Sequence, residues 1–347
     1  MSDVLSPTEP SPVDASQHER AHTLIATESV SKYFPVHPSV LGTASRFIRA
    51  VDGVSLRVRY GETVAVVGES ACGKSTLGRL LLRLIDPTLG RIVFEGTDIT
   101  QTPERALLPV RRRMQVVFQD PTSSLNPRMP VGEIIGEAIR IHRLARSRIE
   151  ERDRVARWLK SVGLRPEAAA LYPHEMSGGQ RQRVAIARAL AVEPRFIVCD
   201  EPTASQDVST QAQIINLLVE LQETTGVAYL WISHDLSLVH HVSDRVAVML
   251  LGRIVEQASA DDLYDSPRHP YTKALLASVP QIVSGLPPPT FPITGAPPSP
   301  VVPPSGCAFH PRCPRAVRGV CDRDVPILEE TPRGSGHRVA CWISDEG

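Results

Sequence analysis

The sequence predicts an α/β protein whose chemistry lies where parallel strands end. Two short apolar runs, residues 63–67 (TVAVV) and 196–199 (FIVC), have the length and composition of buried strands. Residues 178–258 continue as alternating helix and strand patterns, as a parallel sheet requires. A glycine-rich segment follows the first run and an acidic pair follows the second. Ligands of open α/β sheets bind at such strand ends.

The 347 residues suffice for one main domain with an appendage. Residues 1–21 are rich in Ser, Pro, Glu and Asp, and we expect a disordered tail there. Residues 22–118 have strand-rich patterns, followed by the glycine-rich turn and its helix. The pattern between Gln119 and Glu175 turns helical, with residues 131–144 and 149–162 as the clearest helices.

The glycine-rich segment has the pattern of a phosphate-binding loop. It reads Gly-x-x-x-x-Gly-Lys-Ser and lies between a strand and the helical pattern of residues 74–84, a setting that disfavours the alternative of an ordinary turn. Backbone N–H groups and the helix start would surround phosphates, with Lys74 at the β- and γ-phosphates and Ser75 on Mg²⁺. The expected ATP-binding residues of this loop are Gly68, Glu69, Ser70, Ala71, Cys72, Gly73, Lys74, Ser75 and Thr76.

Ala71 departs from the glycine that is commoner at its place in this loop. If the backbone there needs a positive φ, alanine costs about 1 kcal/mol, and we expect the loop to tolerate it.

Asp200 and Glu201 directly follow the second predicted strand. Two carboxylates there can have separate roles: Asp200 would hold Mg²⁺, directly or through water, and Glu201 would polarise the attacking water. Without other motifs, such an Asp-Glu pair would more simply be a solvent-exposed strand end with no catalytic role. The phosphate loop upstream favours the catalytic interpretation.

These ordered motifs resemble the nucleotide-binding subunit of ATP-binding cassette transporters, over about residues 23–260. The resemblance implies a P-loop ATP-binding cassette fold in residues 22–260. That fold has a mixed sheet core, an antiparallel β subdomain and a helical subdomain at about residues 120–175, which grips the permease.

The resemblance also implies roles for three further residues. Phe34 matches the aromatic residue on which adenine stacks, with Tyr33 as the alternative one position earlier. Gln119 matches the glutamine that contacts Mg²⁺ and the attacking water, and that links the site to the transmembrane partner. His234 matches the switch histidine on the γ-phosphate. The implied catalytic residues are Glu201, His234, Gln119 and Lys74, and the implied Mg²⁺ ligands are Ser75, Gln119 and Asp200.

Residues 177–180 (SGGQ) match the family signature. Ser177 is a good N-cap for a helix over residues 178–190, and the start of that helix suits a phosphate. A flexible turn is the alternative from the residues alone. The resemblance implies that the signature, Ser177, Gly178, Gly179 and Gln180, contacts ATP held by a second subunit. It identifies Asp207 as the aspartate of the D-loop, where residues 204–206 (ASQ) depart from the usual Ser-Ala-Leu.

Residues 261–347 form the predicted C-terminal extension. Residues 267–272 (PRHPYT) resemble a segment of oligopeptide and dipeptide importers, and we interpret His269 as a helix-start residue rather than a ligand. Ten prolines among residues 280–304 predict an extended connector. A four-cysteine tail, residues 305–347, follows it.

The tail contains Cys307, Cys313, Cys321 and Cys341. A reducing cytosol disfavours disulfides for such a group, but the spacing alone does not select a metal. A [4Fe–4S] cluster, zinc and unligated thiols remain open, and the resemblance implies the [4Fe–4S] cluster. We expect a structural site that the connector holds away from the nucleotide, so that Cys313→Ser leaves nucleotide affinity close to normal.

Lys plus Arg equals Asp plus Glu, at 38 each, so no global charge favours nucleic acid or an anionic membrane. No apolar run approaches the roughly 18–20 residues that span a bilayer, and the N-terminus lacks signal-peptide regions. We expect a peripheral protein at the cytoplasmic face of the cell membrane.

The predicted function is that of the ATP-hydrolysing subunit of a binding-protein-dependent importer of oligopeptides or dipeptides. Its cofactors would be ATP, Mg²⁺ and the [4Fe–4S] cluster. Its partners would be two integral-membrane permease subunits, a second ATP-binding subunit and, through the complex, an extracellular peptide-binding protein, with no nucleic acid. One alternative is a soluble cassette ATPase acting on DNA or ribosomes, which usually has a long coiled-coil insertion or two cassettes. Another is an importer of nickel or another small solute.

Overall fold

The computed structural model describes residues 22–36, 46–204, 206–278, 295–331 and 336–344. The predicted N-terminal tail, Ser205 and residues 279–294, which include most of the predicted connector, lie outside the described residues.

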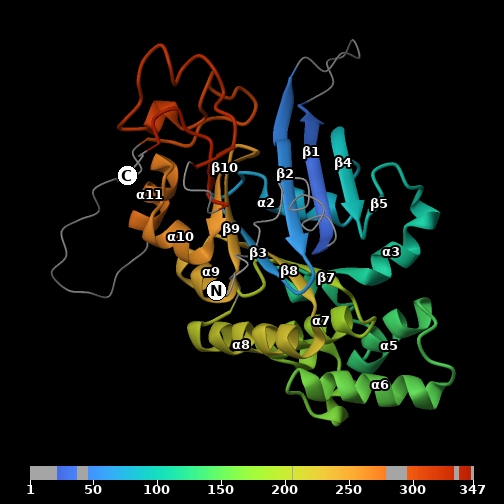
Figure 1. The fold of residues 1–347 in the computed structure, drawn as a ribbon. Helices are drawn as coiled ribbons and strands as arrows, with labels where there is room; N and C mark the ends of the chain where they lie inside the picture. Colours follow the sequence, from blue (N-terminus) through green and yellow to red (C-terminus); the bar gives the residue numbers. More distant parts are fainter. Residues whose placement is uncertain (1–21, 37–45, 205, 279–294, 332–335, 345–347) are drawn as a thin grey trace, which may run out of the picture.

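An eight-stranded mixed sheet forms the core (Figure 1), in the order β11-β12-β10-β9-β3-β8-β7-β6. Its strands are β3 (Thr63–Val67), β6 (Met114–Val117), β7 (Phe196–Asp200), β8 (Ala228–Ser233), β9 (Arg245–Leu250), β10 (Arg253–Ser259), β11 (Glu329–Glu330) and β12 (Arg338–Val339). The strands from β9 to β6 pair in parallel, and β10, β12 and β11 add antiparallel strands at one edge. Every residue of β3 and β8 is buried, which explains their apolar sequences.

Helices cover both faces of this sheet. They include α2 (Lys74–Leu81), α7 (Gly178–Leu190), α8 (Val208–Thr225), α9 (Leu236–Val242) and α10 (Ala260–Asp265). Helix α2 lies very close to β7, because a Cβ added at Gly78 would be 2.9 Å from Val198 Cγ1. This close approach fixes the start of α2, and with it the phosphate loop, against the sheet.

A second, antiparallel sheet lies beside the core in the order β2-β1-β4-β5 (Figure 1). It contains β1 (Thr23–Pro35), β2 (Phe47–Arg59), β4 (Leu89–Phe94) and β5 (Thr97–Asp98). The apolar side chains of this sheet share one hydrophobic cluster with α2, including Leu24, Val54 and Leu77. The mixed core and antiparallel sheet predicted from the sequence are therefore both present.

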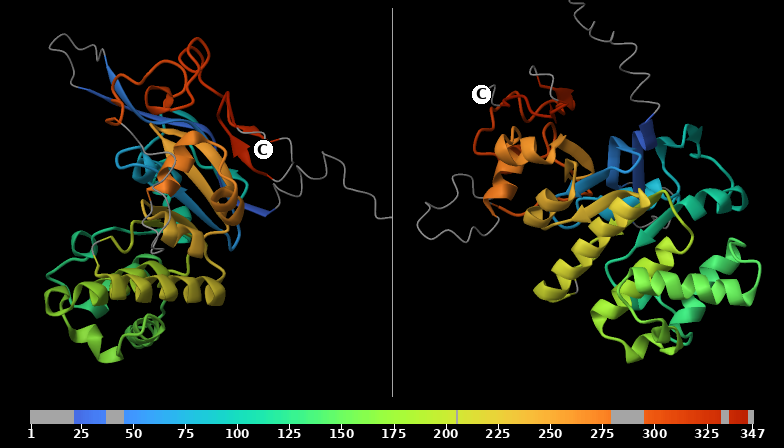
Figure 2. Two further views of the ribbon diagram at one scale, coloured as in Figure 1. Left: turned by 90° about the vertical axis from the view of Figure 1, so that its left-hand side faces the viewer. Right: turned by 60° about the horizontal axis from the view of Figure 1, so that its bottom comes forward.

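The helical segment contains α4 (Pro121–Ser124), α5 (Val131–Ile141) and α6 (Arg148–Ser161), after α3 (Leu108–Arg113). It lies at the opposite end of the molecule from the C-terminal extension in all three views (Figures 1 and 2). The predicted helix 131–144 is shorter than expected, because Arg143 has a positive φ of 52° that ends the helical conformation.

The C-terminal extension joins the core sheet. Strand β12 pairs with β10, and the N–H of Ala340 donates to the carbonyl of Val255 at 2.8 Å. The fully buried Glu256 carboxylate accepts the N–H groups of Arg268 and His269, at 2.6 and 3.0 Å, and pairs with His337 Nε2 at 2.7 Å. The start of α11 (Pro270–Ala277) and His337, just before β12, are thus held at one buried carboxylate.

None of the helices in the described ranges has both the length and the apolar character needed to cross a membrane.

Candidate functional site

Strand register brings the predicted site residues to one edge of the core sheet. Val67 of β3 pairs with Ser233 of β8, Asp200 of β7 pairs with Ile232, and Val117 of β6 pairs with Cys199. Because these strands are parallel, the segments that follow them begin at the same edge. Those segments start with Gly68, Phe118, Glu201 and His234.

The phosphate loop has backbone conformations that favour glycine. Gly68 and Gly73 have φ values of 152° and 110°, and a Cβ at either would lie 2.1 Å or less from a backbone oxygen. Ala71 has a positive φ of 62°, the conformation for which a cost is expected, and alanine there costs about 1 kcal/mol. The buried Lys74 Nζ donates to the carbonyls of Gly68 and Glu69, at 2.8 and 3.0 Å. The loop thus surrounds the ammonium group at the start of α2.

Ser75 and Asp200 meet in the arrangement expected of Mg²⁺ ligands. Ser75 Oγ donates to Asp200 Oδ1 at 2.8 Å. Burial raises the pKa of Asp200, while the hydrogen bond from Ser75 opposes that effect. A hydroxyl and a carboxylate are the hard oxygen donors that Mg²⁺ prefers, so this pair fits the ion. Gln119 is exposed just beyond β6, at the same edge of the sheet.

Glu201 and His234 form the second pair of the site. His234 Nδ1 lies 3.2 Å from Glu201 Oε1, and the His234 side chain is 60% exposed. Glu201 has φ 47°, and its N–H donates to the carbonyl of Ile232 at 2.9 Å. The carboxylate that follows β7 is thereby held beside β8, where it can orient a water molecule next to the imidazole.

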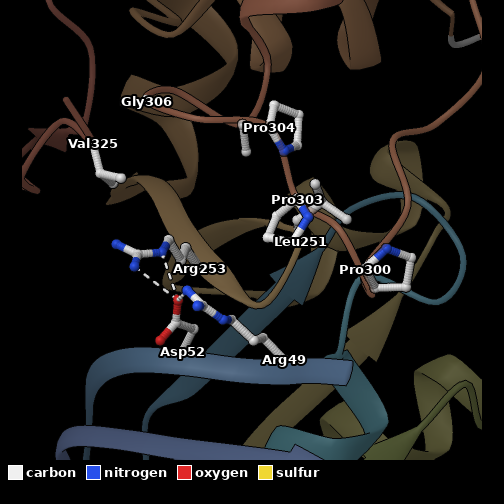
Figure 3. A pocket seen from close by; sticks show the side chains of 10 residues that line it. Arg49, Asp52, Leu251, Arg253, Pro300, Pro303, Pro304, Gly306 and Val325 are labelled. Carbon is white, nitrogen blue, oxygen red and sulfur yellow. Dashed lines mark hydrogen bonds and ion pairs between the residues drawn. The ribbon is translucent and has the colours of Figure 1, made fainter. Parts of the chain in front are cut away.

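The structure distinguishes the two candidates for stacking on adenine. Tyr33 Oη donates to Asp52 Oδ1 at 2.6 Å, whereas the Phe34 ring is 37% exposed. Burial opposes ionisation of Asp52, but the hydrogen bond from Tyr33 and the ion pair with Arg253 lower its pKa. Figure 3 shows Asp52, Arg253 and Arg49 at a pocket between β2 and residues 300–306. Because Tyr33 is engaged with Asp52 and the Phe34 ring is exposed, Phe34 remains the candidate for stacking on adenine.

Ser177 is the N-cap of α7, as the sequence predicts. Its hydroxyl accepts the N–H of Gln180 at 3.3 Å, and the Gln180 side chain accepts the N–H of Ser177 at 2.9 Å. Asp207 caps α8 by accepting the N–H of Thr210 at 2.9 Å, and the hydrogen bonds from Ser209 and Thr210 hold its pKa at about 2.

The signature lies against the start of α8. A Cβ at Gly179 would be 2.6 Å from Thr210 Cγ2, and one at Gly178 would be 3.1 Å from Gln206 Oε1. The signature and the D-loop are therefore in direct contact.

Two residues that sequence reasoning missed contact the phosphate loop from the C-terminal extension. Arg312 forms an ion pair with the Glu69 carboxylate at 2.7 Å, and Tyr271 Oη accepts the N–H of Glu69 at 2.9 Å. The expectation that the cysteine tail is held away from the nucleotide loop is therefore wrong. No local pattern indicated these contacts, since 243 and 202 positions separate the partners.

The four cysteines of the tail are all free thiols, as are Cys72 and Cys199. Burial raises the pKa of Cys341 to about 11, and the thiols of Cys307, Cys313 and Cys321 contribute to the rise. The described part of the chain contains no group of three or more His, Cys, Asp or Glu side chains arranged to hold a metal ion. The structure thus does not bear out the predicted metal site.

The core sheet, phosphate loop and strand-end carboxylates define the class of P-loop cassette ATPases. Residues 51–204 match the family described as ABC transporter. Residues 255–321 match the family described as oligopeptide/dipeptide transporter, C-terminal region. The chain belongs to the ATP-binding proteins of the oligopeptide/dipeptide ABC transporters.

Curated relatives match nearly the full length of the chain. A probable peptide ABC transporter ATP-binding protein of Sinorhizobium fredii, y4tS, is 51% identical, covering 92% of this chain and 90% of the relative. The oligopeptide transport ATP-binding protein AppF of Bacillus subtilis is 47% identical, covering 92% of this chain and 97% of the relative. The dipeptide transport ATP-binding protein DppF of Haemophilus influenzae is 42% identical, over 93% and 97%.

Solved structures support the same fold. The ATP-binding cassette MJ0796, solved as a dimer in a post-hydrolysis state with ADP and Pi, has a TM-score of 0.61 and 30% identity. The match covers 68% of this chain and 98% of the cassette. CbiO1 of Clostridium perfringens, part of the transporter complex cbiONQ, has a TM-score of 0.60 and 29% identity, over 71% and 92%.

Proposed function

We propose that this protein hydrolyses ATP with Mg²⁺ to power a binding-protein-dependent importer of oligopeptides or dipeptides, at the cytoplasmic face of the cell membrane. The observation that carries the proposal is the convergence of the Lys74 loop, the Ser75–Asp200 pair and the Glu201–His234 pair at one sheet edge. Relatives described as peptide transport ATP-binding proteins support the cargo class. They disfavour an ATPase acting on DNA or ribosomes and an importer of nickel.

Each site residue has a proposed part in hydrolysis. Lys74 and the loop N–H groups bind the β- and γ-phosphates, and Phe34 stacks on adenine. Ser75, Asp200 and Gln119 would hold Mg²⁺, whose positive charge would stabilise the developing charge on the phosphates. Glu201 orients and polarises the attacking water, and His234 contacts the γ-phosphate.

The proposed active unit contains two nucleotide-binding subunits. The exposed N-terminus of α7, with Ser177, Gly178, Gly179 and Gln180, would bind the phosphates of ATP held by the second subunit. ATP would then close the two subunits together, and hydrolysis would release them. The dimeric form reported for the cassette MJ0796 supports this arrangement.

The proposed assembly also contains two integral-membrane permease subunits and an extracellular peptide-binding protein. The helical segment would transmit closure to the permease, with Gln119 connecting that segment to the nucleotide. We propose a related second ATP-binding subunit as the dimer partner.

The test of this function is Glu201→Gln in the assembled transporter. We expect ATP to bind with normal affinity, while hydrolysis at this chain's own site falls by about 10²- to 10⁴-fold, because the amide keeps the shape but cannot polarise water. The control Glu223→Gln removes an exposed carboxylate of α8 and should change neither quantity. Lys74→Ala should instead weaken ATP binding itself. Full turnover by Glu201→Gln at this site would remove Glu201 from the catalytic role.

We further propose that Cys307, Cys313, Cys321 and Cys341 ligate a [4Fe–4S] cluster with a structural role. Besides burial, the thiols of Cys307, Cys313 and Cys321 each help to raise the pKa of Cys341, which supports the proximity of the four side chains. Four thiolates suit either this cluster or zinc, so metal analysis distinguishes them. Protein isolated without oxygen should contain iron and acid-labile sulfide near four each per chain, as this cluster type requires. Stoichiometric zinc without sulfide would contradict the cluster.

A further inference from the structure

The C-terminal extension binds the phosphate loop through a buried ion pair. Arg312 Nη1 donates to Glu69 Oε1 at 2.7 Å, and Arg312 Nη2 donates to Glu69 Oε2 at 2.9 Å. Two parallel bonds between guanidinium and carboxylate form the strongest and most directional type of protein ion pair. The Arg312 side chain is 3% exposed and that of Glu69 is 21% exposed, so solvent screens the pair only weakly.

The extension also binds the backbone of the same loop residue. The N–H of Glu69 donates to Tyr271 Oη at 2.9 Å, and burial raises the pKa of Tyr271, so its phenol stays protonated. The carbonyl of Glu69 accepts from Lys74 Nζ. The N–H and the carboxylate of Glu69 are thus held by the extension, while its carbonyl contacts the lysine expected to bind phosphate.

The groups that hold Glu69 form one packed unit. The Tyr271 and Phe309 rings lie 5.3 Å apart between centroids, and the Arg312 guanidinium lies 5.4 Å from the Phe309 ring. The N–H of Arg312 donates to the carbonyl of Phe309 at 2.9 Å. This unit connects the start of α11 to the short segment between Cys307 and Cys313.

We propose that Arg312 and Tyr271 are positioning residues of the phosphate loop, through which the C-terminal extension sets the affinity for ATP. The inference rests on the proposed ATP-binding function. Glu69 lies in the loop that would surround a negatively charged triphosphate, and an unpaired carboxylate there would repel it. Arg312 neutralises that carboxylate, and Tyr271 fixes the backbone from which it projects.

The test compares ATP affinity and melting temperature among single and double variants in the full-length protein. Arg312→Gln leaves the Glu69 charge unpaired, and we expect ATP to bind roughly tenfold more weakly. Glu69→Gln in the same background removes the repelling charge and should recover most of the affinity. Arg318→Gln removes an exposed arginine of the extension and should have no effect.

A second variant tests the backbone contact. Tyr271→Phe keeps the ring in place but removes the hydrogen-bond acceptor for the Glu69 N–H, and we expect ATP to bind about threefold more weakly. If Arg312→Gln does not fold, Arg312→Lys keeps the charge but loses the bidentate geometry, and it should show an intermediate affinity.

The outcomes separate this inference from the function on which it rests. Failure of the unaltered protein to bind ATP would overturn the proposed function. Normal ATP affinity in both Arg312→Gln and Tyr271→Phe would overturn the inference alone. A loss in Arg312→Gln that Glu69→Gln does not relieve would also overturn it, because Arg312 would then support only the fold.

Discussion

His269 makes the stability of the extension depend on pH. It is fully buried at the N-cap of α11, where Nδ1 accepts the N–H of Tyr271 at 3.0 Å. Burial lowers its pKa from 6.5 to about 4, although the nearby Glu256 carboxylate and the backbone of Ala340 oppose the shift. A protonated ring could not accept the capping hydrogen bond.

The size of the effect follows from the difference in pKa between the folded and unfolded states. As pH falls below 6.5, the unfolded chain takes up a proton that the folded chain excludes, so folding becomes less favourable. The loss is complete near the folded-state pKa of about 4, and it amounts to about 3 kcal/mol. At pH 7.5 the full stabilisation is present.

The assay is urea unfolding at several pH values between 7.5 and 4.5, for the unaltered protein and for His269→Asn. Asparagine provides a capping oxygen but does not titrate. Since both proteins share every other titrating group, the difference between their unfolding free energies isolates His269. We expect the advantage of the unaltered protein to fall by about 2 kcal/mol between pH 7 and pH 5. The exposed His241→Asn is the control and should not alter the pH dependence. Parallel pH profiles for His269→Asn and the unaltered protein would refute the reasoning.

Two further predictions concern assembly and the tail. Ser177→Arg should block ATP-driven dimerisation, measured by light scattering, because the larger side chain occupies the N-terminus of α7. ATP should still bind to this chain's own loop. ATP-driven dimers of that variant would contradict a nucleotide site shared by two subunits. Cys313→Ser should lose iron and also weaken ATP binding, because Arg312 directly precedes Cys313 in the segment that holds Glu69. Iron loss with unchanged ATP affinity would show that the tail and the phosphate loop are independent.

Local signals predicted the parts of the fold that local interactions determine. The strand Thr63–Val67 and the helix Gly178–Leu190 have the predicted bounds. Five consecutive buried residues, four of them apolar, specify the strand, and the Ser177 cap specifies where the helix begins. His269 also caps a helix, as its position before Pro270 indicated.

The sequence could not predict how the extension meets the cassette. Strand β12 is only two residues long, and its place in the sheet depends on pairing with β10 and on the contact between His337 Nε2 and the Glu256 carboxylate. Such pairing joins residues about eighty positions apart, so no periodic pattern marks it. The proline-rich composition suggested separation of the tail from the cassette, but tertiary pairing determines where the tail lies.

The contacts of Glu69 change the interpretation of the C-terminal region. A loop with a strained alanine at φ 62° and a carboxylate beside the expected phosphate site contains two features that oppose tight ATP binding. The extension offsets the second feature, because Arg312 neutralises the carboxylate and Tyr271 fixes its backbone. A cassette cut after β10 would leave Glu69 without either partner. If ATP binds as proposed, the nucleotide site includes these two residues of the extension, and the boundary near residue 260 divides the sequence without dividing the site.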